Sequence, residues 1–210
     1  METGKIGKLI LARHGESEWN KLGKWTGLTD IPLSEHGKEE SIKMGELVKD
    51  IHFDYLFTSK LIRAKETLSL MTAYREDTKN IQTEEASELN ERDYGDYTGK
   101  NKWEIEKLIG EKEFIKLRRG WDFPICNGES LKMVYERTVP FFLKKILPII
   151  LESKNVLVVA HGNSIRSIIK YIENIPDEKI DSVEMNFGSI LIYDLDKDGH
   201  MVKKEERKLE

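Results

Sequence analysis

Two histidines occupy matching positions at the ends of two short apolar segments. His14 follows the run Leu9–Ala12 after a single arginine, His161 directly follows the run Val156–Ala160, and a glycine comes after each histidine. Apolar runs of this length are typical of buried strands, and the glycine lets the backbone turn sharply close to a ligand. If the two strands are neighbours in a parallel sheet, both imidazoles lie in the crevice at the carboxyl ends of the strands, where open α/β sheets bind ligands. With the arginine beside His14, the pair indicates an active site that handles phosphate.

Three further arginines and a glutamate carry charge that such a site could use. Arg63 lies in the first turn of a predicted helix, where backbone amides and the helix dipole favour an anion, although a solvated surface arginine is the alternative. Arg118 and Arg119 present planar guanidinium groups suited to carboxylate and phosphate, but cations also stabilise a helix C-terminus without any ligand. Glu91 lies in the polar segment 88–99, which has no regular period, and is the candidate general acid or base.

Predicted strands and helices alternate along the chain. Apolar patterns predict strands near residues 9–12, 54–58, 81–84, 156–160 and 189–195, and helices near residues 35–50, 60–71, 102–119, 129–152 and 164–173. This order predicts an α/β fold, a three-layer sandwich in which a mostly parallel central sheet is flanked by helices. The last of these strands is a candidate for antiparallel pairing.

Local signals mark the boundaries of these elements. Ser34 and Ser59 are predicted helix N-caps, and residues 16–33, which contain two glycines and a proline, are predicted to form a loop over the site. Two prolines inside the helix predicted at residues 129–152 should kink or split it. The charged tail 203–210 is predicted to be mobile.

Length and composition limit the class of protein. The 210 residues suit a single domain spanning 1–210, and a formal net charge of −4 gives no indication of a nucleic-acid or acidic-membrane surface. The only cysteine, Cys126, cannot form an internal disulfide, and no segment has the pattern of a signal peptide or a membrane span. We therefore expect a cytoplasmic protein whose partner is a small molecule, not a nucleic acid or a membrane.

Several common cofactor motifs do not occur. The sequence has neither GxGxxG after the first strand nor GxxxxGK[ST] anywhere, which argues against nucleotide binding, and it has no HExxH and no cysteine cluster. His14, His161 and Glu91 could in principle hold a metal ion, but Arg13 beside His14 would repel a cation. We expect no metal.

The segment Arg13–Asn20, RHGESEWN, resembles the signature of the histidine phosphatase superfamily, and specifically of its 2,3-bisphosphoglycerate-dependent phosphoglycerate mutases. The resemblance continues in order over nearly the whole chain. The matching segments are Thr26–Gly27, Thr58–Ser59 with Arg63–Ala64, Leu89–Arg92 with Tyr94–Gly95, Gly99 with Asn101–Lys102, Arg118–Arg119, Asn127–Leu131 and Ala160–Ser164. The Leu-Asn-Glu-Arg segment, Lys102 and the paired arginines separate mutases from most plain phosphatases.

The resemblance implies a role for each matching residue. His14 would be the nucleophile that carries the phosphoryl group on a ring nitrogen, and Glu91 would move the proton of the substrate hydroxyl. The residues implied to hold the phosphoryl oxygens are Arg13, Arg63, His161, Asn20 and Gly162. Those implied to bind the carboxylate and the other phosphate, or to complete the substrate site, are Ser17, Thr26, Gly27, Arg92, Tyr94, Lys102, Arg118, Arg119 and Asn163.

The implied activity is the interconversion of 3-phosphoglycerate and 2-phosphoglycerate in glycolysis and gluconeogenesis. In this family's cycle the phosphoenzyme gives its phosphoryl group to 3-phosphoglycerate, and the resulting 2,3-bisphosphoglycerate turns in the site and returns its other phosphate. The bisphosphate also primes the enzyme, and no metal is required. A phosphomonoesterase of the same superfamily, in which water takes the phosphoryl group, is the alternative, and a non-catalytic domain that keeps the fold is a second.

Three segments depart from the family pattern. The chain between Arg119 and Asn127 is short, and Asp93 stands where a histidine is common. Asn186–Ser189 replaces the usual Thr-Gly-Val-Pro, which leaves the local shape and closure of the site open. The sequence leaves the oligomeric state open between a monomer and a homo-oligomer.

Overall fold

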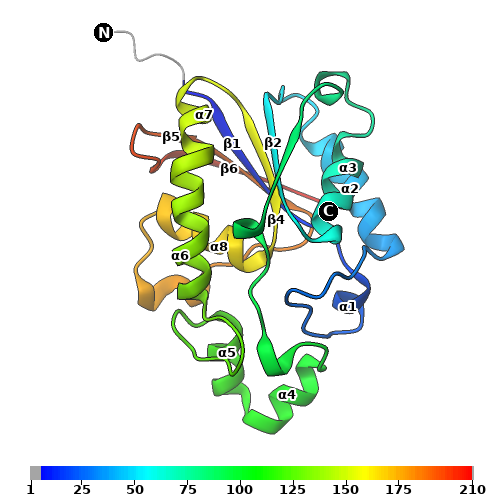
Figure 1. The fold of residues 1–210 in the computed structure, drawn as a ribbon, viewed down its shortest axis with the longest axis vertical. Helices are drawn as coiled ribbons and strands as arrows, with labels where there is room; N and C mark the ends of the chain where they lie inside the picture. Colours follow the sequence, from blue (N-terminus) through cyan, green and yellow to red (C-terminus); the bar gives the residue numbers. More distant parts are fainter. Residues whose placement is uncertain (1–5, 210) are drawn as a thin grey trace.

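A six-stranded sheet forms the middle layer of the molecule (Figure 1). The fold is taken from a computed structural model, which describes residues 6–209. In sheet order the strands are β3 (Thr83–Ala86), β2 (Tyr55–Ser59), β4 (Val156–Ala160), β1 (Lys8–Arg13), β5 (Ser189–Leu195) and β6 (Met201–Lys208). The first four run parallel, β5 runs antiparallel to β1, and β6 runs antiparallel to β5. The predicted mostly parallel sheet is confirmed, and so is the antiparallel pairing of the strand at residues 189–195.

The two apolar strands β1 and β4 are neighbours. Leu9 pairs with Val156 and Arg13 pairs with Ala160, so the strands end at the same edge of the sheet. Residues 9–12 and 156–160 are fully buried, because both strands lie in the middle of a sheet that is covered on both faces. The register therefore brings the two His-Gly segments together.

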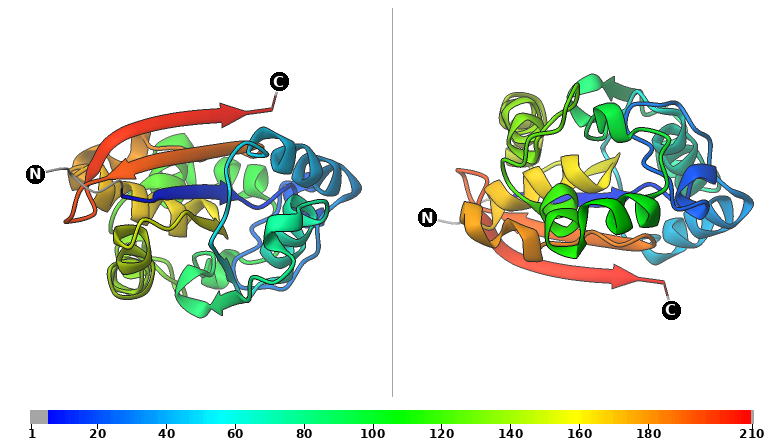
Figure 2. Two further views of the ribbon diagram at one scale, coloured as in Figure 1. Left: turned by 90° about the horizontal axis from the view of Figure 1, so that it is seen from above. Right: turned by 90° about the horizontal axis from the view of Figure 1, so that it is seen from below.

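Helices cover both faces of the sheet (Figure 2). On one face, α2 (Glu35–Leu47) and α3 (Ile62–Thr72) bury Met44, Ala64 and Leu68 against the sheet. The elements on the other face are α6 (Leu131–Phe141), the π-helix η4 (Phe142–Ile146), α7 (Leu147–Leu151) and α8 (Gly162–Ile172). The three-layer sandwich is confirmed.

A third apolar cluster lies beyond the carboxyl ends of the strands. It is built on α4 (Lys102–Ile109) and α5 (Glu111–Arg119), here called the cap, which pack with Trp25 and Tyr94. The single helix predicted over residues 102–119 is wrong, because the chain breaks at Gly110, which has a φ of +82°. Glycine adopts this left-handed conformation readily, so the two halves can turn and bury Ile105 and Phe114 in the same cluster.

The prolines in the long helical segment act as predicted. Pro140 lies in the last turn of α6, where it has no N–H to donate, and the π-helix η4 follows directly. Pro148 lies in the first turn of α7, where a missing N–H costs little. The segment therefore stays helical while its hydrogen-bonding pattern changes twice.

Three predictions about local structure are wrong. Ser59 does not cap α3, whose N-cap position is Leu61 without a side-chain hydrogen bond. Residues 16–33 are not all loop, because Ser17 caps the short helix α1 (Glu18–Lys21). The tail is not mobile over residues 203–208, which belong to β6; Glu210 lies outside the described residues.

The pairing of β6 explains why a charged tail is ordered. Its backbone is hydrogen-bonded to β5, and Arg207 donates to the Leu47 carbonyl at 2.7 Å and forms an ion pair with Asp50 at the end of α2. Lys and Glu side chains suit an edge strand because they discourage pairing with another chain. A segment rich in charged side chains of both signs is therefore an edge strand in this chain.

Short helical turns join the larger elements. These are the 3-10 helices η1 (Glu76–Thr78), η2 (Ser87–Leu89), η3 (Gly95–Tyr97) and η5 (Asp177–Ser182). Across residues 6–209, none of the helices combines the length and the apolar character that crossing a membrane requires.

Candidate active site

His14 and His161 lie side by side at the carboxyl ends of β1 and β4. Their ring centroids are 4.8 Å apart with 56° between the ring planes, and their exposed fractions are only 2% and 0%. The predicted meeting of the two histidines is confirmed. Two imidazoles this close and this buried favour the uncharged form of each ring.

The backbone around His14 fixes which ring nitrogen is free. Nδ1 lies 2.7 Å from the Gly15 carbonyl oxygen, which can only accept, so Nδ1 donates and Nε2 keeps its lone pair. Burial lowers the pKa of His14 well below its usual value, and the positive charges of Arg63 and Arg13 lower it further. Gly15 is needed here because a Cβ would lie 2.4 Å from the Gly37 carbonyl oxygen. His14 thus has a neutral, oriented ring whose Nε2 lone pair is free, as a nucleophile requires.

His161 is held by the opposite nitrogen. Ser59 Oγ accepts from the Leu61 N–H at 3.2 Å and lies 2.6 Å from His161 Nε2, and we assign the proton of this second hydrogen bond to the hydroxyl, which has no other acceptor among the described residues. The proton of the neutral ring then sits on Nδ1, which is buried without a hydrogen-bond partner. Burial is the largest cause that lowers the pKa of His161 well below its usual value, and Arg63 and His14 contribute to the lowering.

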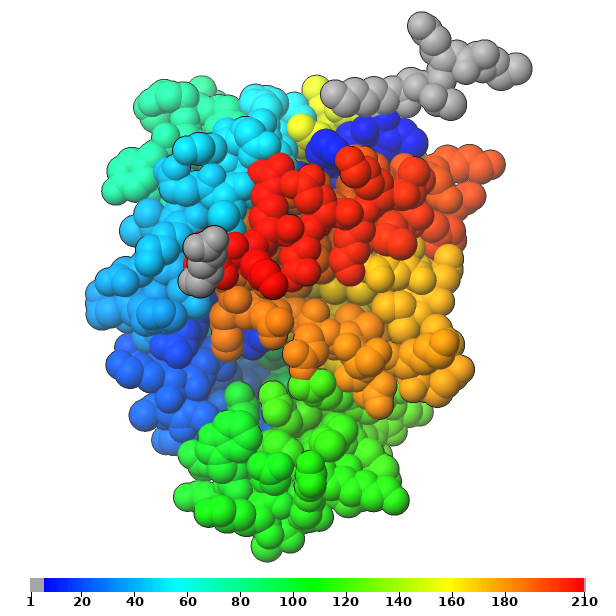
Figure 3. Space-filling model, turned by 180° about the vertical axis from the view of Figure 1, so that it is seen from behind, coloured from blue at the N-terminus to red at the C-terminus, as the bar shows by residue number. Residues whose placement is uncertain are grey.

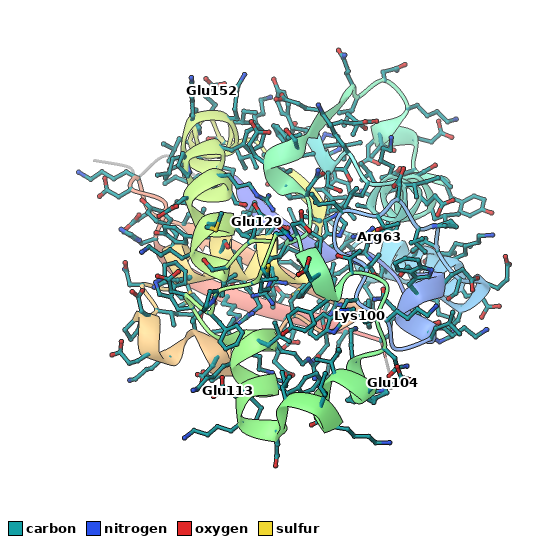
Figure 4. The ribbon with its side chains drawn as sticks, turned by 60° about the horizontal axis from the view of Figure 1, so that its bottom comes forward. Arg63, Lys100, Glu104, Glu113, Glu129 and Glu152 are labelled. Atoms are coloured by element: carbon teal, nitrogen blue, oxygen red, sulfur yellow. The ribbon has the colours of Figure 1, made fainter. Side chains whose placement is uncertain are left out.

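Two arginines present further donors to the same place. Arg63 donates to the carbonyls of Gly27 at 2.9 Å and Thr29 at 3.0 Å, and Arg13 donates to the Met185 carbonyl at 2.8 Å. The Nε of each arginine is buried and has no partner. Burial lowers the pKa of both arginines, that of Arg63 to about 10, so Arg63 stays charged at neutral pH. Figure 4 shows Arg63 among the side chains that α3 contributes.

Glu91 is a buried carboxylate, and one of its two oxygens is held by hydrogen bonds. Oε1 accepts from the Arg92 N–H at 2.7 Å and from Asn163 Nδ2 at 2.9 Å. Oε2 faces Gly162, whose ideal Cβ would be 3.7 Å away. Asn163 Nδ2 also donates to the Tyr94 hydroxyl at 2.9 Å. This geometry leaves Oε2 available for proton transfer beside the His-Gly segment of β4.

A cavity of about 390 Å³ opens next to these groups. The predicted site residues that line it are Arg13, Glu91, Tyr94, Lys102, Arg118, Arg119, Gly162 and Asn163. Burial, together with the positive charges of Arg118 and Arg13, lowers the pKa of Lys102 to about 8. The cavity therefore suits an anion.

The other predicted residues do not line this cavity, and His14, His161 and Arg63, described above, are among them. Ser17 and Asn20 hydrogen-bond each other in the cap of α1, with Ser17 Oγ donating to Asn20 Oδ1 at 2.8 Å. Thr26 is buried with an unpartnered hydroxyl. Arg92 lies behind the Tyr94 ring, 4.6 Å from its centroid. Gly27, noted above, contributes its carbonyl to Arg63.

Residues 183–188, here called the strap, were not predicted as part of the site, and 183–187 line one side of the cavity. Glu184 forms an ion pair with Arg119, the Met185 carbonyl accepts from Arg13, and the Phe187 ring stacks on the Arg13 guanidinium. Local sequence offers no motif for these contacts, although the departure from the family pattern at residues 186–189 marks the place.

Arg166 and Ser59 also belong to the site but were not predicted there. Arg166 is buried, lines the cavity and donates to Asn163 Oδ1 at 3.1 Å and to the Arg119 carbonyl at 2.9 Å. The sequence spacing could have indicated Arg166. It lies four residues after Gly162 on α8, so the two residues are on the same face of the helix.

The chain matches a protein-family model and is similar to several known proteins. The family model described as "Histidine phosphatase superfamily (branch 1)" matches residues 9–207. A 2,3-bisphosphoglycerate-dependent phosphoglycerate mutase from Parvibaculum lavamentivorans is 41% identical over 201 residues, which are 94% of each chain. A phosphoglycerate mutase from Schizosaccharomyces pombe is 42% identical over 199 residues, again 94% of each chain.

Solved structures share the fold. Bacillus stearothermophilus YhfR superimposes with a TM-score of 0.81 at 25% identity, covering 93% of this chain and 95% of its own. The alpha-ribazole phosphatase from Shigella flexneri gives a TM-score of 0.77 at 25% identity, covering 96% of this chain and 95% of its own.

Proposed function

This chain belongs to the histidine phosphatase superfamily, and we propose that it is a 2,3-bisphosphoglycerate-dependent phosphoglycerate mutase that interconverts 3-phosphoglycerate and 2-phosphoglycerate. Relatives about 40% identical over nearly the whole chain carry that name. We propose that the chain acts as one cytoplasmic catalytic domain on a small phosphorylated anion.

One observation carries the proposal. Arg13 Nε, Arg63 Nε and His161 Nδ1 are buried donors without partners, and all three belong to residues grouped around neutral His14. A buried donor without a partner is costly in a folded protein unless a ligand satisfies it. A phosphoryl group on His14 Nε2 has the charge and the acceptor oxygens to satisfy these donors.

The residues of the site divide the chemistry between them. His14 Nε2 attacks phosphorus, and the three donors stabilise the charge that spreads over the equatorial oxygens in the transition state. Glu91 Oε2 takes the proton of the attacking substrate hydroxyl and returns it to the leaving oxygen of the second transfer. The cations Lys102, Arg118 and Arg119 bind the carboxylate and the phosphate that does not move.

The same cations fit the primer. When bound, 2,3-bisphosphoglycerate supplies the first phosphoryl group for His14. It carries two phosphates and a carboxylate, and the site offers a matching excess of positive side chains along its cavity. The local field of these side chains attracts such an anion although the whole chain is acidic, with a net charge of −4.

Phosphorus NMR tests the proposal directly. The enzyme is given 3-phosphoglycerate and a chelator, with and without catalytic 2,3-bisphosphoglycerate. We expect 2-phosphoglycerate to form in a bisphosphate-dependent manner with little inorganic phosphate. Release of phosphate without the second isomer would instead make the protein a phosphomonoesterase.

The nucleophile is tested by the variant His14→Ala, with His52→Ala as a control. The side chain of His52 is 64% exposed and pairs with Asp54 and Asp77, outside the cavity. His14→Ala should lose phosphorylation and turnover, and His52→Ala should keep both. Substantial mutase activity in His14→Ala would show that another group carries the phosphoryl group.

A further inference from the structure

An aromatic ring outside the family's signature segments covers the nucleophile. The Phe187 ring centroid lies 3.7 Å from Arg13 Cζ and 5.8 Å from the His14 ring centroid, with 65° between the two rings. His161 packs on His14 from a separate element, at 4.8 Å between centroids. Phe187 is thus the apolar side chain of the strap that lies against both Arg13 and His14.

The strap is attached on both sides of Phe187. Before Phe187, Val183 packs against the apolar core on the face of the sheet that α6, α7 and α8 cover. Met185 is buried, and its carbonyl accepts a hydrogen bond from Arg13. After it, the Gly188 carbonyl accepts from the Leu209 N–H at 3.1 Å. In Figure 3 the orange segment that contains the strap lies between the red strand β6 and the green cap. These contacts hold the ring over the site.

The stacking leaves the donors of Arg13 free to work. A guanidinium group attracts an aromatic ring through its flat face, whereas its N–H groups point outward in the plane. Phe187 therefore covers the face of Arg13 without competing for Nε, which is buried and unpartnered. The ring occupies a position next to both Arg13 and His14 that a water molecule would otherwise take.

Exclusion of water matters because the phosphoryl group of a phosphohistidine can pass either to the substrate hydroxyl or to water. In the unwanted reaction the oxygen of water bonds to phosphorus, the phosphorus–nitrogen bond breaks and its electron pair returns to His14 Nε2. Inorganic phosphate then carries away both protons of the water. A mutase has to make this reaction slower than transfer to the substrate hydroxyl.

Resting on the proposed mutase function, we propose that Phe187 is a specificity-determining residue: its ring shields phosphorylated His14 from water and so sets the ratio of phosphoryl transfer to hydrolysis. The strap thereby supplies in this chain a closure that the signature segments do not provide. The proposal concerns the lifetime of the phosphoenzyme, and it predicts a specific effect on that lifetime.

The test measures the lifetime of the phosphoenzyme. Wild type, Phe187→Ala, Phe187→Tyr and Phe141→Ala are labelled with radioactive 2,3-bisphosphoglycerate, freed of ligand, and followed by loss of protein-bound label without an acceptor. Phe141 is a matched control, because it is also half-buried but packs on Phe57 and does not line the active-site cavity. The ratio of phosphate release to isomer exchange is measured on the same samples.

We expect Phe187→Ala to lose its label at least about tenfold faster than wild type. The ratio of phosphate release to isomer exchange should rise by a similar factor. Phe187→Tyr, which keeps a ring, and Phe141→Ala should both behave like wild type. Equal lifetimes in Phe187→Ala and wild type would overturn the inference. A slower phosphorylation with an unchanged lifetime would also overturn it, because the ring would then serve only to hold Arg13.

Failure of the mutase function itself has a separate signature. Wild type that accepts no label, or that gives no isomer exchange, would overturn the proposed function and this inference together. Wild type that exchanges isomers while Phe187→Ala keeps a normal lifetime would overturn this inference alone.

Discussion

The chemistry of the two histidines depends on which ring nitrogen carries the proton. The Gly15 carbonyl accepts a hydrogen bond from Nδ1 of His14, whereas the Ser59 hydroxyl is hydrogen-bonded to Nε2 of His161. The rings are therefore set in opposite tautomers, one with a free lone pair and one with a free N–H. In the proposed mechanism, the free lone pair of His14 and the free N–H of His161 act on the same phosphoryl group without a proton moving between them.

Glu91 gives the first prediction at this scale. Glu91→Gln keeps the shape of the side chain but cannot accept the substrate proton, so turnover should fall by about a hundredfold to ten-thousandfold. Steady-state mutase assays measure the loss, with Glu88→Gln in the same segment as the control. A near-normal rate would mean that another group moves the proton.

Ser59 gives the second prediction. Ser59→Ala removes the hydrogen bond to His161 Nε2, so the proton of the ring is no longer confined to Nδ1. The loss of one such hydrogen bond is worth about 1.5 kcal/mol, so kcat should fall about tenfold with little change in KM. Ser87→Ala, which removes a hydroxyl just after β3, is the control. An equal rise in KM would instead place Ser59 in substrate binding.

At the scale of elements, the site is assembled at strand ends. β1 and β4 deliver the histidines, α3 delivers Arg63 just after β2, and α8 begins at Gly162, where its N-terminal amides favour an anion. The cap supplies Lys102, Arg118 and Arg119 from beyond the sheet. Figure 4 labels Glu104 and Glu113 on the same two helices, so the cap carries both signs of charge.

The edge strand gives the prediction at this scale. Arg207 connects β6 to the end of α2 through the Leu47 carbonyl and Asp50. Because Asp50 is largely exposed, Arg207→Ala should lower the free energy of unfolding by only about 1 kcal/mol, with normal mutase activity. Denaturant unfolding measures the change. Lys203→Ala on the same strand is the control, and an equal loss in both variants would argue against a specific role for Arg207.

At the scale of the whole molecule, burial of the site links its chemistry to stability. The pKa values of His14 and His161 are lowered in the folded chain, mainly by burial, whereas an unfolded histidine has a pKa near 6.5. Below about pH 6.5 the unfolded chain therefore binds more protons than the folded one, and stability falls as the pH falls toward the lowered values. Above about pH 6.5 the stabilisation is fully present.

This linkage gives the prediction for the whole molecule. Thermal unfolding between about pH 7.5 and pH 5 should show a steeper loss of stability in wild type than in His14→Gln, which lacks one of the two groups. Ser87→Ala, which removes no titratable group, should keep the wild-type slope. Identical slopes in wild type and His14→Gln would show that His14 titrates normally in the folded protein.

The sequence by itself determined the fold class, the family and the meeting of the two histidines. Apolar runs and the His-Gly steps that follow them are local patterns, and the alternation of strands and helices leaves few ways to build a sheet. Glu91 and the paired arginines were predicted as site residues from short segments and Lys102 from the family resemblance, and all four line the cavity. The roles implied for Ser17, Asn20 and Arg92 stay predictions.

Only the tertiary structure decided the tautomers, the contribution of Arg166, the strap and the order of the charged tail. Ser59 and His161 are 102 residues apart in sequence, and Arg13 and Met185 are 172 apart. Local patterns report period, caps and turns, whereas these contacts depend on which strands become neighbours and in which register. Ser59 has the local pattern of a helix cap, but the register of β2 against β4 brings its hydroxyl to a histidine.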